Sequence, residues 1–522
     1  MDELTKRIYD AKKQFSKFRD RDFREYQVEA IKFITEATKK IVVCCLPTGA
    51  GKSLIGAVSA EVNGGGIYMV HSKPLQVQLQ GDFPELPILW GRGNYKCLQS
   101  QGRASCGECT HTQLSPCENK AGKCEYVVAK RIARNAPTKI LNYEYWITET
   151  NYVGQFAGES MVVIDEADSL EGTMARFINL EFSEGMLRML GITTPKYKTT
   201  TSEHSIDNWK DWADTAGMKV ERLIGTMTTQ LSCANPDPEI IARKERLTGI
   251  KRKLDMFVES VDSTWLYDEK EYEGRTTISF KPTWISPYVA NKYVWSKADK
   301  FVLMSATFPP MPVLAKTLGV KLGDIVYKEF KSTFDPDNRP IILNPVANIT
   351  YKSEPREMEA AIGEIKKLLE KHKGEKGLIH TVSYKLTKAV MDIGDPRLVT
   401  HNGSNKIDAI EEFRESKEPL VMVSPSSERG ISLDGDMCRW CVWLKAPFLS
   451  LGDKLVSARI YKSTLGNLWY KSNAIMTVVQ GCGRLVRSKE DYGVVYILDA
   501  QIVKLLTENP SMAPYWWREA IV

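Results

Sequence analysis

The sequence predicts an α/β protein with two parallel, doubly wound sheets and a helical region between them. The chain has 522 residues, which at about 150 residues per domain gives about three to four domain-sized units. Short β-rich runs alternate with helix-like stretches from Ile41 to about Ser169, and sheet-like runs return from Phe301 to Leu498. Charged residues at 26% and hydrophobic residues at 43% lie near globular averages and exclude a mainly disordered, collagenous or coiled-coil chain.

Apolar runs of strand length define the two sheets. In the first stretch they are Ile41–Val43, Ile67–Val70 and Val162–Ile164. Later in the chain they are Phe301–Met304, Gly377–Ile379, Leu420–Val423, Cys441–Leu444 and Val494–Leu498. Three prolines, Pro336, Pro340 and Pro345, cluster between residues 334 and 345. We place the boundary between the two α/β units there, because proline interrupts regular structure.

The region from about Leu170 to Lys297 is predicted to be helical. Two apolar stripes at helical spacing support this: Val220, Leu223, Ile224, Met227 and Leu231, then Leu247, Ile250, Leu254, Phe257, Val258 and Val261. The segment Cys233–Glu239 between them contains two prolines, which cannot continue a helix. A helical hairpin is the expected result.

Composition gives some indication of where the protein works. The longest apolar run, Ile41–Leu46, is far shorter than the roughly 20 residues that span a bilayer, so no membrane association is expected. Asp2 and Glu3 stand where a secretory signal needs a basic segment. We therefore expect an intracellular protein of the cytoplasm, nucleoid or nucleus. The net charge of +6 and the pI of about 8.5 indicate a nucleic-acid partner only weakly.

A phosphate-binding loop is predicted after the first strand, where the sequence Leu46-Pro-Thr-Gly-Ala-Gly-Lys-Ser53 leads into a helical pattern. In such a loop the backbone wraps the phosphates, the lysine reaches the β/γ-phosphates and the hydroxyl ligates Mg²⁺. The nucleotide-binding residues are then Thr48, Gly49, Ala50, Gly51, Lys52 and Ser53. Leu46 replaces the usual first glycine, and a chance Gly-Lys-Ser in a surface loop is the alternative.

An acidic motif, Met161-Val-Val-Ile-Asp-Glu-Ala-Asp168, ends an apolar strand of the same unit. Asp165 is expected to hold Mg²⁺, and Glu166 to orient or deprotonate the attacking water. An acid-rich helix N-terminus is the alternative. The phosphate loop earlier in the same unit favours the catalytic interpretation.

Three further segments are candidates for the same chemistry. Gln480 to Arg487, in the second unit, places Arg484 and Arg487 on one face if the segment is helical. Arginines there can stabilise transition-state charge, although a solvated basic face is the alternative. Gln27 could read an adenine through its amide or be a surface residue, and Ser305–Thr307 could couple nucleotide to polymer.

In this order the segments resemble the motifs of superfamily 2 helicases: Gln27, the Lys52 loop, Asp165–Asp168, Ser305–Thr307, Gly430–Leu433 and Gln480–Arg487. Four more segments are similar to the iron-sulfur DNA helicases of the XPD/DinG type: Gly91–Cys97, Cys124–Tyr126, Asn142–Glu144 and Lys445–Asp453. The resemblance covers most of the chain. It departs at Asp168, where the family usually has His, and at Arg429 and Ser432, where it has Glu and Asp.

The resemblance implies two RecA-like motor domains with an inserted iron-sulfur cluster domain and a helical arch domain. Motor domain 1 would comprise residues 1–90, 131–169 and 298–340, the cluster domain 91–130, the arch 170–297 and motor domain 2 residues 341–522.

The resemblance also implies an ATP-dependent DNA helicase that translocates on single-stranded DNA, 5′ to 3′ by analogy, and unwinds duplexes. The implied cofactors are ATP, Mg²⁺ and a 4Fe-4S cluster, and the implied partner is single-stranded and forked DNA. We expect a monomer. The implied catalytic residues are Lys52, Asp165, Glu166, Gln480, Arg484 and Arg487.

Five cysteines fall within residues 97–124, namely Cys97, Cys106, Cys109, Cys117 and Cys124. In a reducing compartment such clustering indicates metal rather than disulfides. By the resemblance, the outer cysteines Cys97 and Cys124 are cluster ligands; we expect Cys109 and Cys117 as the inner pair, with Cys106 as the alternate. Zinc held by four thiolates is the competing interpretation, because Cys106 and Cys109 have zinc half-site spacing. The match at Gly91–Cys97 favours iron-sulfur.

The segment 91–130 also has the composition of a single-strand DNA track, which combines basic side chains with aromatic ones. Arg92 is expected to contact DNA, and Tyr95 either stacks on a base or packs a small core. Lys73 lies where the superfamily contacts DNA phosphates.

Two other functions stay open. One is an RNA remodeller, or a translocase that strips proteins without separating strands. The other is a non-catalytic nucleic-acid-binding module with a structural thiolate metal site.

Overall fold

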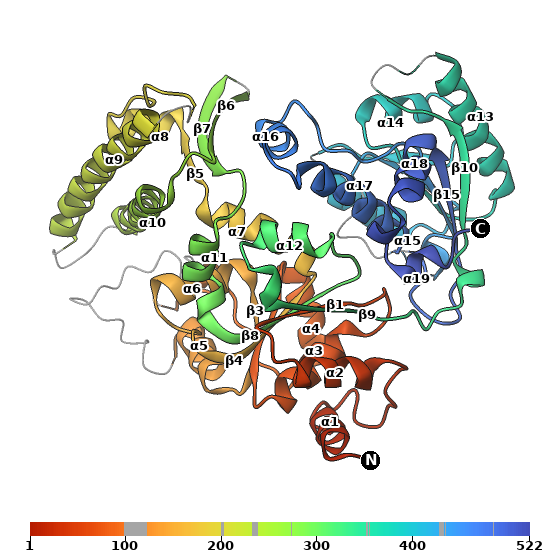
Figure 1. Ribbon diagram of the computed structural model, residues 1–522, viewed down its shortest axis with the longest axis horizontal. Helices are drawn as coiled ribbons and strands as arrows, with labels where there is room; N and C mark the ends of the chain where they lie inside the picture. The colour runs from red at the N-terminus through yellow and green to blue at the C-terminus, as the bar shows by residue number, and fades with distance from the viewer. Residues whose placement is uncertain are drawn as a thin grey trace.

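The structure is a computed structural model that describes residues 1–98, 123–199, 203–231, 238–272, 274–350, 353, 355–403, 405–426, 433, 435–483 and 485–522. It contains two six-stranded sheets and one three-stranded sheet. Figure 1 shows the two large α/β units side by side, with the yellow and light green part of the chain beside the first. The prediction of two parallel α/β domains is confirmed.

The first sheet is entirely parallel, with the strand order β3-β2-β4-β8-β1-β9. Its strands are β1 (Ile41–Cys45), β2 (Gly66–Val70), β3 (Thr138–Asn142), β4 (Glu159–Asp165), β8 (Ala298–Ser305) and β9 (Ile325–Glu329). The register pairs Cys45 with Ser305 and Asp165 with Met304. The ends of β1, β4 and β8 therefore meet at the carboxyl edge of the sheet, where parallel α/β sheets bind ligands.

Both faces of this sheet are covered, because successive strand residues point to opposite sides. Ile41 and Val43 belong to one core cluster, whereas Val42 and Cys44 belong to the other. The face containing Val42 packs against α1 (Glu3–Lys13), α2 (Gln27–Glu36), α3 (Lys52–Val62) and α4 (Lys73–Asp82). The opposite face packs against α5 (Glu125–Asn135), α6 (Tyr143–Tyr152), α7 (Leu170–Ile178), α11 (Pro287–Tyr293) and α12 (Met311–Leu318).

The arch region is only partly helical. The predicted hairpin is confirmed by α9 (Glu203–Gln230) and α10 (Pro238–Ser260), which pack together, and a short α8 (Glu184–Leu190) precedes it. The prediction of helix throughout is wrong, because β5 (Leu180–Ser183), β6 (Trp265–Tyr272) and β7 (Arg275–Pro282) form an antiparallel sheet in the order β5-β7-β6. Ile278 and Phe280 of β7 are buried at period-two spacing. Charged residues between and beside the apolar ones hid this pattern.

The second sheet is also parallel, in the order β10-β15-β14-β11-β13-β12. Its strands are β10 (Ile341–Ala347), β11 (Gly377–His380), β12 (Leu398–Thr400), β13 (Val421–Ser424), β14 (Trp440–Trp443) and β15 (Val494–Asp499). The surrounding helices are α13 (Pro355–Lys371), α14 (Tyr384–Met391), α15 (Lys406–Glu415), α16 (Lys454–Lys462), α17 (Gly466–Cys482), α18 (Ala500–Glu508) and α19 (Tyr515–Arg518). Residues 330–340 connect β9 to β10 and thus join the two sheets. Within the described part of the chain, every helix is too short or too polar to cross a bilayer.

Candidate active site

The predicted phosphate loop connects β1 to the N-terminus of α3. Gly49 has φ +75° and Gly51 has φ +74°, in the left-handed region that glycine adopts without steric cost. The turn delivers the chain into α3 at Lys52, so the unpaired N–H groups of the first helical turn adjoin the loop. The Lys52 Nζ donates to Pro47 O at 3.4 Å and thus lies across the loop. This is the strand-loop-helix geometry that binds phosphate.

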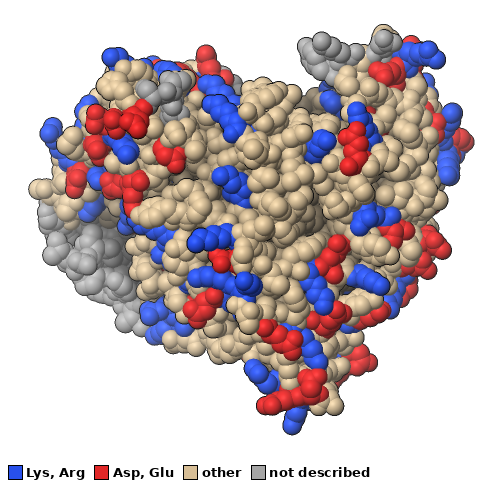
Figure 2. All heavy atoms as spheres, in the orientation of Figure 1, with Lys and Arg blue, Asp and Glu red and all other residues tan. Residues whose placement is uncertain are grey.

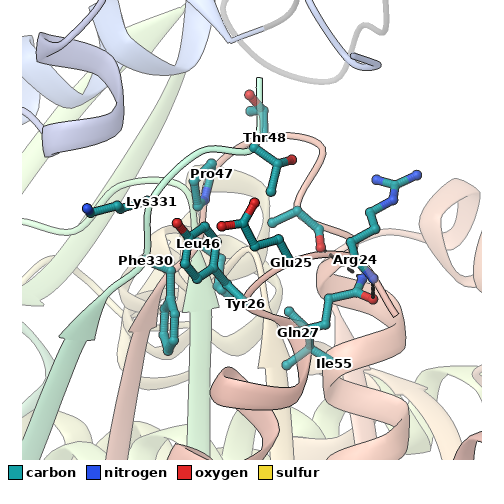
Figure 3. A pocket seen from close by; sticks show the side chains of 12 residues that line it. Arg24, Glu25, Tyr26, Gln27, Leu46, Pro47, Thr48, Ile55, Phe330 and Lys331 are labelled. Carbon is teal, nitrogen blue, oxygen red and sulfur yellow. Dashed lines mark hydrogen bonds between the residues drawn. The ribbon is translucent and has the colours of Figure 1, made fainter. Parts of the chain in front are cut away.

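Gln27 packs against the phosphate loop and hydrogen-bonds to it. Its side chain is 3% exposed; Nε2 donates to Ala50 O at 3.0 Å, and Oε1 accepts from the Arg24 N–H at 2.8 Å. A Cβ on Gly51 would lie 2.4 Å from Gln27 Nε2, so only glycine fits there. Figure 3 shows Gln27 in the small pocket that Arg24, Tyr26 and Phe330 also line. The contacts give Gln27 a bracing role, and its contact with an adenine stays a prediction.

Asp165 lies at the end of β4 with 9% of its surface exposed. Its Oδ2 accepts from the Tyr68 hydroxyl at 2.8 Å, and its Oδ1 accepts from the Glu166 N–H at 3.0 Å. Burial raises the pKa of Asp165, and the opposing charge of Lys52 lowers it. The carboxylate is thus held in place close to the lysine of the phosphate loop.

Glu166 has a left-handed backbone, with φ +54°, which costs a non-glycine residue about 1–3 kcal/mol. Its Oε2 lies 2.8 Å from His71 Nδ1, just beyond the end of β2. Both side chains are partly exposed, at 45% and 38%. Sequence reasoning missed His71, because nothing in the sequence pairs β2 with β4.

Asp168 joins the two motor domains. Its Oδ1 accepts from Ser305 Oγ at 2.8 Å, and its Oδ2 accepts from Gln480 Nε2 at 2.9 Å. The same Gln480 amide donates to Thr307 Oγ1 at 2.9 Å. Trp516, near the C-terminus, also donates from Nε1 to Ala306 O at 3.2 Å. Segments 165–168, 305–307 and 480 therefore form one hydrogen-bonded network.

Motor domain 2 also lies directly against the phosphate loop. A Cβ on Gly483 would lie 2.8 Å from Thr48 Cγ2, and a Cβ on Gly49 would lie 3.1 Å from Arg487 O. The ring of Phe334, in the connection to motor domain 2, covers Gly49 on another side, 2.2 Å from the same Cβ position. The segment that carries the predicted arginines thus borders the loop. The Arg487 side chain is exposed, and Arg484 lies outside the described residues, as do Arg429, Gly430 and Ser432.

The residues present fit a magnesium ion. Ser53 and Asp165 offer a hydroxyl and a carboxylate, the oxygen ligands that Mg²⁺ prefers, and the hydroxyl of Tyr68 donates to the Asp165 carboxylate. Mg²⁺ is usually bound through one or two protein ligands plus substrate phosphates. The described residues contain no group of three or more His, Cys, Asp or Glu that could hold a metal.

The two ends of the cysteine segment come together. The rings of Tyr95 and Tyr126 lie 5.5 Å apart, two residues before Cys97 and two residues after Cys124, and both cysteines are partly buried. The predicted inner ligands Cys109 and Cys117, and the alternate Cys106, lie outside the described residues.

The three residues predicted to contact DNA, Tyr95, Arg92 and Lys73, lie in different surroundings. Tyr95 is buried, at 9% exposed, and its hydroxyl accepts from the Trp90 N–H at 3.2 Å. Tyr95 thus packs in the large core of the first α/β unit, which favours its packing alternative over stacking on a base. Arg92 forms an ion pair with Glu245 of α10 at 2.7 Å, across to the arch. Lys73 is exposed at the start of α4, where it hydrogen-bonds to Asn94.

Known proteins resemble this chain in both sequence and fold. Residues 365–520 match the family model described as helicase C-terminal domain. The ATP-dependent DNA helicase YoaA of Escherichia coli K12 is 30% identical over 105 residues, which is 19% of this chain and 16% of YoaA. An XPD helicase structure aligns over 94% of this chain and 98% of its own, with TM-score 0.60 and 16% identity. The S. tokodaii Xpd4 structure aligns over 95% and 99%, with TM-score 0.57 and 14% identity.

The paired parallel sheets carry a phosphate loop at one carboxyl edge, with a second domain against it. Residues 365–520 match a helicase C-terminal domain, and the fold of the chain is similar to that of the XPD helicase structures. The matched segment spans 16% of the length of YoaA.

Proposed function

We propose that the protein is an ATP-dependent DNA helicase that translocates on single-stranded DNA, 5′ to 3′, and unwinds duplexes. The observation that carries this proposal is the contact of Gln480 with both Asp168 and Thr307. Through it, the acidic motif, the segment after β8 and motor domain 2 are bonded within one site. A change at the nucleotide can therefore move one domain relative to the other.

The roles of the side chains follow from their positions. Lys52 neutralises phosphate charge, Ser53 and Asp165 supply oxygens to Mg²⁺, and Glu166 orients or deprotonates the attacking water. His71, at 2.8 Å from Oε2, contacts the Glu166 carboxylate and would help to orient it. Arg487 would approach the phosphates from motor domain 2, and Arg484, which lies outside the described residues, keeps the role that the resemblance implies.

Asp168 stands where the family usually has histidine. Its contacts support coupling between ATP hydrolysis and movement on DNA rather than a loss of that coupling. One carboxylate accepts hydrogen bonds from Ser305 and from Gln480. Bonds to a charged acceptor contribute more than neutral ones, about 1.5–3 kcal/mol each. This favours an active motor over a non-catalytic binding module.

The DNA track is proposed from position rather than charge. Lys and Arg are interspersed with Asp and Glu over the face seen in Figure 2, so no single-sign patch marks a path on that face. Lys73, at the start of α4, and the Arg92–Glu245 pair between the segment 91–98 and α10 are our candidates along the strand.

A thiolate-bound 4Fe-4S cluster in the segment 97–124 is part of the proposal. Its support is the tyrosine contact that brings the flanks of Cys97 and Cys124 together. Iron and sulfide analysis of anaerobically purified protein, with its visible spectrum, distinguishes a brown iron-sulfur protein from a colourless zinc protein.

The function is tested by Lys52→Ala. Loss of the ammonium beside Pro47 should lower DNA-stimulated ATP hydrolysis at least about 100-fold, because it leaves phosphate charge uncompensated. The matched control is Lys39→Ala, an exposed lysine of the same domain, which should keep wild-type turnover. Retained hydrolysis in Lys52→Ala contradicts the assignment.

Strand displacement separates the remaining alternatives. Wild-type protein with ATP should displace a strand from 5′-tailed and forked DNA but not from 3′-tailed DNA. Displacement only from RNA, or hydrolysis without displacement, favours the RNA remodeller or the protein-stripping translocase.

A further inference from the structure

Tyr68 contacts the carboxylate that is expected to hold magnesium. It lies in the centre of β2 and is 1% exposed. Its hydroxyl donates to Asp165 Oδ2 at 2.8 Å. A phenol has a single proton, and this hydrogen bond uses it.

Helix α3 has a glycine where the Tyr68 ring packs against it. A Cβ on Gly56, four residues after Lys52, would lie 2.5 Å from Tyr68 Cε2. Glycine inside a helix costs about 0.5–1 kcal/mol relative to alanine. The phosphate-loop helix therefore carries a destabilising residue at the point where the tyrosine passes beneath it.

The hydrogen bond from Tyr68 matters for metal binding. A carboxylate that ligates a cation must be held in one orientation, and the proton of Tyr68 fixes one oxygen of Asp165 from a buried position in the sheet.

We infer that Tyr68 is a positioning residue for the magnesium site, holding the Asp165 carboxylate in the orientation in which it would ligate Mg²⁺. The inference rests on the proposed ATPase function and names the residue that prepares its metal site. Loss of such an outer contact costs about 10- to 100-fold in metal affinity in other proteins.

Tyr143 offers a matched control. It is as deeply buried, at 2% exposed, and its hydroxyl donates to Asp165 as well, but to the main-chain oxygen rather than to the carboxylate. Tyr68→Phe and Tyr143→Phe thus each remove one buried phenol hydroxyl next to the same residue. Only the first touches the metal-binding oxygens.

The experiment titrates MgCl₂ into protein with the fluorescent nucleotide N-methylanthraniloyl-ADP, without DNA. For Tyr68→Phe, the Mg²⁺ concentration at half-maximal binding should rise about 10-fold or more. For Tyr143→Phe it should stay within about twofold of wild type. An unchanged midpoint in Tyr68→Phe, or an equal shift in both variants, overturns the inference.

Thermal unfolding in EDTA checks that both variants fold. A third variant, Tyr68→p-aminophenylalanine, keeps a donor and acceptor in the same shape and should restore the midpoint; failure to restore it also overturns the inference. If wild-type protein binds Mg²⁺ and nucleotide but hydrolyses no ATP with DNA, the proposed function fails. The Mg²⁺ concentrations at half-maximal nucleotide binding still test the role of Tyr68 in that case.

Discussion

At the scale of single residues, Gln480 links the two α/β domains into one site. Its Nε2 donates to Asp168 and to Thr307, both in motor domain 1. Replacing Gln480 by Ala removes both bonds and leaves the Asp168 carboxylate with one donor fewer. DNA-stimulated ATP hydrolysis should fall about 10-fold or more, at about 1.4 kcal/mol per factor of ten. Steady-state rates with and without single-stranded DNA check this.

Asn473→Ala is the control for that variant. Asn473 lies two turns earlier on α17, and its amide donates within the helix, to Trp469 O at 3.0 Å. Its replacement should leave the stimulation by DNA unchanged. Equal losses in both variants would trace the effect to α17 itself rather than to the interdomain bonds.

The residues that sequence reasoning found at the site are those whose chemistry and spacing are local. Lys52 follows a glycine-rich turn, and Asp165 ends an apolar strand. Tyr68 and His71 escaped, because a tyrosine in an apolar strand and a histidine after it are ordinary residues until the strand pairing β2–β4 brings Asp165 and Glu166 beside them. The sequence could not decide between stacking and packing for Tyr95 either, because burial is decided by distant neighbours.

At the scale of elements, α16 and α17 meet so closely that one position admits only glycine. A Cβ on Gly466 would lie 1.8 Å from Arg459 O. Gly466→Ala should therefore push the helices apart and destabilise motor domain 2 by about 1–3 kcal/mol. Scanning calorimetry should show a lower unfolding midpoint for that domain.

Gly363→Ala, in the same domain, is expected to stabilise the protein rather than to destabilise it. Gly363 lies on α13, and a Cβ there meets no atom within 4 Å. Alanine should raise helix stability by about 0.5–1 kcal/mol. A loss of stability in this variant would contradict the packing described for both glycines.

Elements with strong periodicity were predictable, and short ones were not. The apolar stripes of α9 and α10 each extend over several turns, so the hairpin followed from spacing alone. The strands β6 and β7 carry Asp, Glu, Lys and Arg among their apolar residues, and β12 has three residues. Such strands are defined by their partners in the sheet more than by their own sequence.

At the scale of the whole molecule, Arg459 of α16 joins motor domain 2 to the arch region. It is 5% exposed, lies between the rings of Trp284 and Trp469 at 4.4 and 4.6 Å, and forms an ion pair with Glu171 at 2.6 Å. Its Nε also donates to Thr283 O at 2.7 Å. Figure 1 shows α16 facing the β6–β7 hairpin across this contact.

Arg459→Ala should loosen this junction, because it leaves Glu171 without its cation and opens a space between two tryptophans. Amide hydrogen exchange in residues 283–286 and 454–462 should become faster by about 10-fold or more. Lys462→Ala, an exposed position on the same helix, should leave exchange unchanged. Unaltered exchange in Arg459→Ala would show that other contacts hold the arch.

The assembly of the site across the chain could not be derived from spacing. Gln27, Asp165, Ser305 and Gln480 are separated by 138, 140 and 175 residues, and only the family resemblance placed them in one order. The structure adds how they meet, through Asp168 and through the contact of Gly483 with Thr48.

That last contact has a kinetic consequence. Phe334 and the main chain at Arg487 lie against Gly49, and Gly483 lies against Thr48. If a triphosphate enters only after these contacts part, opening is a first step whose rate does not depend on the nucleotide concentration. In rapid mixing, the observed association rate should level off at high ATP concentration, and the plateau should measure how often the lobes separate.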